Sequence, residues 1–198
     1  HISASGGSVN MYLLDPKDKF GGHLDGTYGS YNARRIFARV DTGKIGNTNL
    51  KGYISFSAAD ENSWRGPGSQ KKLHGETKWV NEWGNGNRVS LAIVGNQSDS
   101  TLFPSMSLAN WKKYGVNYTY QSKWDSNNPS ANYYKLHQNP FTNIYASAPS
   151  TFRLTDNLTL TETTYFGYGN GNGGGEESES LSSEQYRTEE NKCELKPN

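Results

Sequence analysis

Short segments of alternating apolar and polar residues recur along this chain, separated by clusters of glycine, asparagine and aspartate. The clearest segment spans residues 50–58, where Leu50, Ile54, Phe56 and Ala58 share one face and polar residues or tyrosine occupy the other. Successive side chains of a β-strand point to opposite sides, so a period of two predicts a strand with one apolar face. Helix signals are almost absent. The pattern therefore predicts an all-β protein.

Seven such segments follow one another, and turn signals lie between them. Gly84-Asn85-Gly86-Asn87 and Thr155-Asp156-Asn157 are rich in residues that tolerate the positive φ angles of hairpin turns. Consecutive strands joined by hairpins form an antiparallel meander, so we predict a meander of about seven strands. The expected strands are residues 20–28, 35–41, 50–58, 73–83, 88–93, 144–154 and 158–168.

The apolar content is low for a protein with an ordinary core. Leucine, isoleucine, valine and phenylalanine make up only about 17% of the chain, below the roughly 20% that marks a globular core. A net charge of +1 together with 13 tyrosines and 5 tryptophans argues against disorder. No apolar run is longer than the four residues 11–14, which excludes a transmembrane helix of ~20 residues. A transmembrane β-barrel stays open, because its apolar residues occupy only every second position.

The expected connections differ in length between the two ends of the sheet. Those after the second, fourth and sixth strands are short and polar, whereas residues 61–71 and 101–138 form longer ones. The connection after the first strand, near residues 29–32, falls at the same end as the two longer ones but is short. Outer-membrane barrels have short turns at one end and long loops at the other, and strands of about ten residues span their apolar band. We therefore predict an incomplete segment of a transmembrane β-barrel.

Several short motifs between residues 5 and 175 occur in a fixed order. They are Gly6-Gly7-Ser8-Val9-Asn10, Asp15-Pro16, residues 26–32 with Arg34-Arg35 and Asp41-Thr42-Gly43, Trp64-Arg65-Gly66-Pro67-Gly68, and residues 168–175. Their order and spacing resemble those of TonB-dependent outer-membrane receptors, the plugged transporters that import iron chelates, vitamins and saccharides. The first two are similar to the end of the plug domain and its link to the barrel. The third is similar to the first barrel hairpin, and the last two to outer loops.

This resemblance implies an organisation in three parts. Residues 1–16 would be the end of the plug and the link, residues 17–175 the first seven barrel strands, and residues 176–198 an acidic tail. The tail has seven glutamates against three basic residues and few apolar ones, so we expect it to be disordered. A whole family member has a TonB box, a complete plug and 22 strands. The chain would therefore be a fragment, about one third of a barrel.

The resemblance also implies a location and partners. The protein would lie in the cell outer membrane, contact outer-membrane lipid, and capture a small-molecule ligand such as an iron chelate, a vitamin or a saccharide. Energy would come from the TonB complex through parts absent from this sequence. No nucleic-acid partner is expected, although basic and aromatic residues together also occur in single-strand binders. Seven alternating strands make that interpretation the less economical one.

The long connection at residues 101–138 concentrates aromatic and lysine side chains. Such a surface can stack on a ligand and attract anionic groups. The rings could equally pack the loop onto its neighbours or lie at the level of lipid headgroups. On the ligand interpretation, the candidate contacts of the two loops are Trp64, Arg65, Trp111, Tyr114, Tyr118 and Trp124.

Patterns that carry catalysis or bind metals are missing. The histidines have no ligand spacing, and the lone Cys193 cannot form a multi-cysteine site. The string at residues 169–174 satisfies G-x-G-x-x-G, but no helix pattern follows it. No serine lies in a nucleophile elbow. We expect no catalytic residue, no metal, no cofactor and no enzymatic activity.

A second function stays open: a secreted or surface all-β binding module that holds a saccharide through its aromatic loop. Its apolar face would have to pack against a second sheet. Glu162 bears on this choice, because parity places it on the apolar face beside Leu160. A glutamate is tolerable on a lipid-facing strand but needs a reason. One reason would be a β-bulge at residues 161–164 that turns the carboxylate to the other side; another is that this face does not contact lipid.

Overall fold

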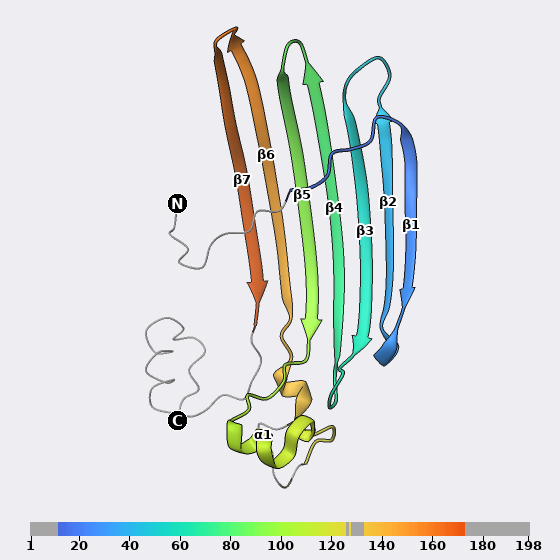
Figure 1. Ribbon diagram of the computed structural model, residues 1–198, viewed down its shortest axis with the longest axis vertical. Coiled ribbons are helices and arrows are strands. Elements are labelled where there is room, and N and C mark those ends of the chain that lie inside the picture. Colours follow the sequence, from blue (N-terminus) through green and yellow to red (C-terminus); the bar gives the residue numbers. More distant parts are fainter. Residues whose placement is uncertain (1–11, 126, 128–132, 173–198) are drawn as a thin grey trace, which may run out of the picture.

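The computed structural model describes residues 12–125, 127 and 133–172, and its seven antiparallel strands form one open sheet (Figure 1). Each strand pairs with its sequence neighbours, in the order β1-β2-β3-β4-β5-β6-β7, so the sheet is a meander that does not close on itself. The predicted all-β class and seven-strand antiparallel meander are confirmed. The strands are β1 (Phe20–Tyr28), β2 (Arg34–Lys44), β3 (Lys51–Asn62), β4 (Ser69–Trp83), β5 (Asn87–Ser100), β6 (Phe141–Thr155) and β7 (Leu158–Gly171).

The strands extend further than the apolar pattern does: β5 continues to Ser100, and β3 and β4 are both longer where they meet. The expected connection at residues 61–71 is wrong, because Glu61 pairs with Gln70 and Asn62 with Ser69. The true loop is residues 63–68. A β-ladder is held by backbone hydrogen bonds, so polar residues continue it after the apolar alternation has ended.

The two ends of the sheet differ in their connections, as Figure 1 shows. Short turns join β2 to β3, β4 to β5 and β6 to β7 at the turn end, whereas the other end, the loop end, carries the long β5–β6 connection. That connection contains α1 (Leu108–Tyr114), η2 (Gly115–Asn117) and η3 (Tyr134–His137), while η1 (Ser30–Asn32) joins β1 to β2. No helix within the described residues is long and apolar enough to cross a membrane.

The strand register gives the sheet one apolar face and one polar face. The residues that we predicted to share the apolar side of the sheet do so in the observed register. They are Ile54, Phe56, Trp79, Leu91, Ile93, Ala146 and Phe152. Leu50 precedes β3. The polar face carries Arg39, Asp41, Tyr53, His74, Glu76, Lys78 and Asn96.

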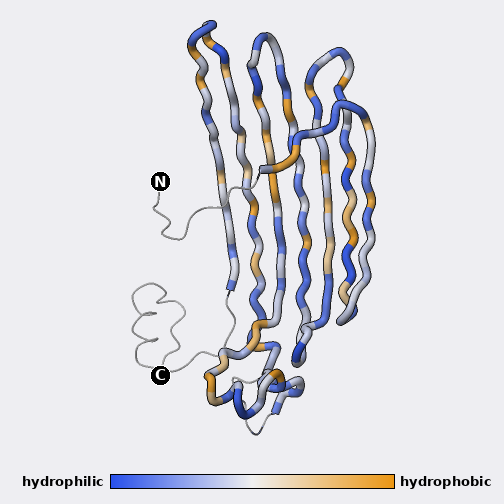
Figure 2. The backbone as a smooth tube through the Cα atoms, viewed as in Figure 1, coloured by the Kyte–Doolittle hydropathy of each residue, from blue (hydrophilic) through white to orange (hydrophobic). Residues whose placement is uncertain are grey.

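Burial is inverted relative to a water-soluble sheet. On the polar face Tyr53 and Asp41 are 0% and 1% exposed, whereas on the apolar face Leu24 and Ile54 are 72% and 61% exposed. Figure 2 shows apolar and hydrophilic residues alternating along the strands. No second layer of described residues covers the apolar face. A contiguous exposed apolar surface of this kind marks a site of contact with a partner or a membrane.

The register around Glu162 tests the first of these two explanations, the β-bulge. The β6–β7 register runs without a shift from Phe141 opposite Gly171 to Arg153 opposite Thr159. The proposed bulge at residues 161–164 is therefore wrong. Glu162 lies on the apolar face, opposite Ser150 on the neighbouring strand.

Candidate functional site

Arg65 lies at the loop end, between two aromatic rings. Its guanidinium carbon is 5.4 Å from the centroid of Trp64 and 4.8 Å from that of Phe103, and the two rings are 6.0 Å apart. Its Nε is buried without a hydrogen-bond partner. Among the described residues, no carboxylate lies within ion-pair distance of Arg65. A cation held by rings and left without a carboxylate can bind an anionic group.

The β3–β4 loop that carries Arg65 is packed against the β5–β6 connection. Gly66 and Gly68 have φ angles of +68° and +116°, which favour glycine. A Cβ atom on Gly66 would lie 2.7 Å from the Thr119 side chain, and one on Gly68 would lie 2.4 Å from Thr101. The two loops therefore meet closely, which brings Trp64 to Phe103 although 38 residues separate them in sequence.

The other predicted ligand contacts form two further groups. The rings of Tyr114 and Tyr118 are 5.9 Å apart, and the Trp124 ring lies 5.6 Å from that of Tyr133. Trp111 lies on α1 and is half exposed. No described ring contact joins these groups to Trp64 and Arg65. The structure thus places all six candidates on the two predicted loops but brings only Trp64 with Arg65, and Tyr114 with Tyr118, into contact.

Packing explains part of the aromatic content. The ring of Tyr120 stacks on that of His137 at 3.7 Å with an angle of 3° between the planes. Burial, and secondarily the neighbouring Tyr118, raises the pKa of the Tyr120 hydroxyl. By contrast, Trp64, Trp111 and Trp124 remain 54%, 50% and 50% exposed. Phe103 is not among the six predicted ligand contacts, yet its ring lies closer to Arg65 than that of Trp64 does.

A second cluster lies on the polar face, where the segment of residues 12–18, here called the strap, crosses the sheet towards β1 (Figure 1). The Asp15 carboxylate accepts hydrogen bonds from Lys78 Nζ at 2.7 Å and from Arg88 Nη2 at 2.8 Å. Lys78 also donates to the Leu13 carbonyl at 2.8 Å, and the Lys17 amide donates to Asp41 Oδ1 at 2.9 Å. The strap is therefore anchored to β2, β4 and β5.

Charge balance explains why Asp15 can be ionised there. Burial on its own would raise the pKa of the Asp15 carboxyl, but the hydrogen bonds from Lys78 and Arg88 outweigh it and hold the pKa below its usual value. The link predicted at Asp15-Pro16 lies in this strap. The expected plug strand at residues 6–10, and the acidic tail with Cys193, lie outside the described residues.

Polar side chains continue the network across the polar face. The Tyr53 hydroxyl donates to Glu76 Oε1 at 2.8 Å, and His74 lies 3.2 Å from the other oxygen of Glu76. His74 Nδ1 is 2.5 Å from Asn96 Oδ1, and Asn96 Nδ2 donates to Asn143 at 2.9 Å. These hydrogen bonds link β3 to β6. The polar face therefore carries a network of hydrogen-bonded side chains across four strands.

Known proteins provide no further constraint on the site. No protein-family model, curated protein or solved structure matches this chain. The family resemblance of its motifs accordingly stays a prediction.

Proposed function

We propose that this chain is an amino-proximal part of a TonB-dependent outer-membrane receptor, whose strands lie in the lipid bilayer and whose loops capture a scarce ligand. The inverted burial carries the proposal: the polar face is closed and hydrogen-bonded, while the apolar face is open. A bilayer is the solvent in which an apolar outer face is stable, and transmembrane barrels alternate apolar-out and polar-in.

The path of the apolar band across the sheet supports this proposal. On β1 the band is centred on Leu24, and the hydrogen-bonded row through Leu24 leads to Gly75 on β4 and Tyr168 on β7. The apolar band on β4 extends from Leu73 to Trp83, so its centre lies about three residues from Gly75 towards the turn end. On β7 the band extends from Leu158 to Tyr168, so its centre lies about five residues from Tyr168 towards the turn end. The band therefore drifts steadily, by about 0.8 residue per strand.

Strands that cross the flat apolar layer of a bilayer at an incline produce such a drift, because each strand meets the layer at a shifted position. With about 3.3 Å per residue and about 4.8 Å between strands, the drift corresponds to strands inclined by about 30° to the slab normal. Transmembrane barrels have tilts of roughly 35–45°. Along β4 the band from Leu73 to Trp83 covers about 33 Å of strand and rises ~28 Å at this tilt, close to the ~25 Å apolar band of such barrels.

The strap supports an enclosed polar face. In a plugged receptor the chain that precedes the first strand comes from inside the barrel, and here the segment before β1 crosses the polar face on Asp15. On this proposal the polar face lines the interior. Energy coupling through the TonB complex would use parts outside this sequence.

The loop end would form the ligand mouth. Within the described part of the chain the Arg65 guanidinium has no carboxylate partner and lies beside two rings, and half-exposed tryptophans lie in the loops at the same end of the sheet. Rings and a cation together fit a ligand with a planar or apolar body and an anionic group. An iron chelate, a vitamin or a saccharide remains within the proposed ligand class.

The genomic DNA flanking the coding region tests the receptor assignment directly. We expect an in-frame plug domain with a TonB box upstream, and further strand segments ending in an aromatic residue downstream. Flanking in-frame sequence that encodes unrelated domains would contradict the assignment.

One observation favours the second candidate, a secreted or surface saccharide-binding module. Asn81, Ser150 and Glu162 lie on the apolar face within the band. Charge at the centre of a lipid-facing band costs free energy, although less for glutamate than for lysine or arginine. In such a module the apolar face would be covered by a second sheet, which the described residues do not contain.

A further inference from the structure

A cavity of about 220 Å³ lies near the loop end of the sheet, and most of its lining side chains belong to the polar face of β1 to β4. Its floor is Ala59 on β3, which lies directly opposite Arg35 on β2 and Lys72 on β4. Parity directs all three side chains to the polar face, where the Arg35 guanidinium carbon is 5.9 Å from the centroid of the Phe37 ring. The small alanine therefore leaves a hollow between two cations.

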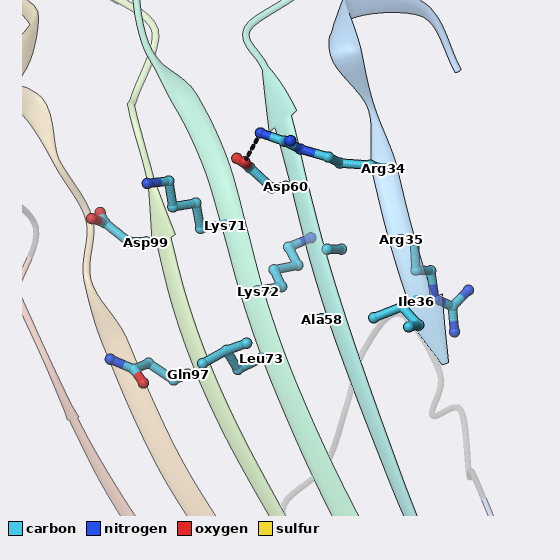
Figure 3. A pocket seen from close by; sticks show the side chains of 11 residues that line it. Arg34, Arg35, Ile36, Ala58, Asp60, Lys71, Lys72, Leu73, Gln97 and Asp99 are labelled. Atoms are coloured by element: carbon cyan, nitrogen blue, oxygen red, sulfur yellow. Dashed lines mark hydrogen bonds and ion pairs between the residues drawn. The ribbon is translucent and has the colours of Figure 1, made fainter. Parts of the chain in front are cut away.

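The apolar side of the same strands differs in its charges. It carries a larger cavity, of about 620 Å³, which Figure 3 shows together with the ion pair at 3.1 Å between Arg34 and Asp60. The charged border of that cavity is neutral as a whole. Its members are Arg34, Asp60, Lys71 and Asp99. The corresponding row on the polar side has two cations and no carboxylate. From β1 to β5 its members are Thr27, Arg35, Ala59, Lys72 and Ser98.

Few carboxylates on the polar face are near enough to neutralise these cations. Asp25 is occupied, because its Oδ2 lies 2.6 Å from His23 Nε2. Glu61, one step closer to the loop end on β3, lines the cavity. Among the described residues, neither Arg35, Lys72 nor Glu61 forms an ion pair. Counted over its lining side chains, the cavity therefore has a surplus of one positive charge.

We propose that this cavity binds a small dianion, a phosphate or a dicarboxylate, between Arg35 and Lys72. A guanidinium binds two oxygens of such a group through parallel N–H donors, and an ammonium adds a point charge. The Thr27 hydroxyl and the Gln70 amide line the same cavity and supply further donors. The inference does not require the membrane location. In the proposed receptor this site would lie on the inner wall, separate from Arg65 at the mouth.

NMR titrations of the isotope-labelled full chain in a nonionic detergent test the site. Inorganic phosphate and malonate are added separately, at a pH at which phosphate carries two charges and at constant ionic strength. Lys72→Gln removes one of the two cations, and Glu61→Gln removes the opposing charge. Lys71→Gln is the matched control, because Lys71 is the preceding residue on β4, is directed to the apolar face and does not line this cavity. Unchanged amide shifts in β6 and β7 verify the fold of each variant.

We expect Lys72→Gln to weaken the binding about fivefold, as for the loss of one solvent-exposed ion pair, and Lys71→Gln to leave it unchanged. Glu61→Gln should tighten it. A saturable, Lys72-dependent response to only one of the two anions supports the site and identifies its chemistry. Equal dissociation constants for the wild type, Lys72→Gln and Lys71→Gln, or no saturable response to either anion, would overturn the inference and leave the receptor proposal as it stands.

Discussion

Replacing Asp15 by asparagine should loosen the strap from the polar face. The substitution keeps the shape of the side chain but removes the charge that faces Lys78 at 2.7 Å and Arg88 at 2.8 Å. Lys78 is only 12% exposed, so it loses the one carboxylate with which it forms an ion pair among the described residues. The backbone carbonyl of Asp15 still accepts from Arg39.

The magnitude follows from the exposure of the pair. A hydrogen bond to a charged group contributes roughly 1.5–3 kcal/mol, but exposed ion pairs contribute about 0–1 kcal/mol because water screens them. The Asp15 side chain is 45% exposed, between these limits. We expect the free energy of local strap opening to fall by about 1–2 kcal/mol, which corresponds to roughly 5–30-fold more of the opened state.

Hydrogen exchange measures that opening. The Lys17 amide donates to Asp41, so its exchange should become about 5–30-fold faster in Asp15→Asn, while amides in the middle of β4 stay protected. Asp156→Asn is the control, because that side chain is 94% exposed at the turn end and far from the strap in sequence. Unchanged Lys17 exchange in Asp15→Asn, or an equal effect of both substitutions, would refute the anchoring role.

Three other predictions concern the strap and the two faces. The pKa of the Asp15 carboxyl is held below its ordinary value of 3.8, so the ionised carboxylate stabilises the strap fully above that pH, and this stabilisation is lost as the pH falls through the lowered pKa. The hydrogen-exchange rate of the Lys17 amide, corrected for its intrinsic pH dependence, should therefore rise below about pH 4, and more in the wild type than in Asp15→Asn. Gly52→Ala should lower the free energy of unfolding in denaturant by about 1–3 kcal/mol, because the added Cβ atom would lie 2.4 Å from the Trp79 ring. Gly75→Ala should lower it clearly less, because the atom nearest to the added Cβ is 3.9 Å away. Equal losses for the two variants would contradict this packing. In the full-length receptor that we propose, Glu162→Leu should raise the stability in lipid or leave it unchanged, and a clear loss would mean that the carboxylate has a partner and that its face does not contact lipid.

The fold was largely predictable because alternation acts locally. A period of two assigns each residue from 50 to 58 to a face without knowledge of any distant residue, and the structure agrees for β3. Polar strand ends were missed, since residues such as Asn62 and Ser69 are paired by backbone hydrogen bonds alone. The helix α1 was also missed, because its seven residues are too short a stretch to show a recognisable helical repeat of apolar residues. Its only sequence signal is the N-cap Ser107, whose side chain accepts a hydrogen bond from the Asn110 amide.

The site was less predictable because its contacts are distant in sequence. Trp64 and Arg65 stood out as part of a loop motif, but the ring that completes their cluster, Phe103, reaches them only because the long connection folds back on the β3–β4 loop. The strap depends on Asp15 meeting Lys78 and Arg88, which come 63 and 73 residues later. No local pattern marks such pairs, since each residue alone resembles an ordinary solvated charge.

Accessibility of spin labels in lipid bilayers tests the central claim most directly. In a Cys193→Ser background, single labels replace Ile54 and Phe56 on the apolar face, and Ser55 and Ser57 on the polar face. We predict an alternating profile, in which labels at 54 and 56 collide with oxygen dissolved in the lipid and labels at 55 and 57 are shielded from it. Equal access of all four labels to a water-soluble nickel complex, or an alternation of opposite phase, would contradict a membrane-facing apolar surface.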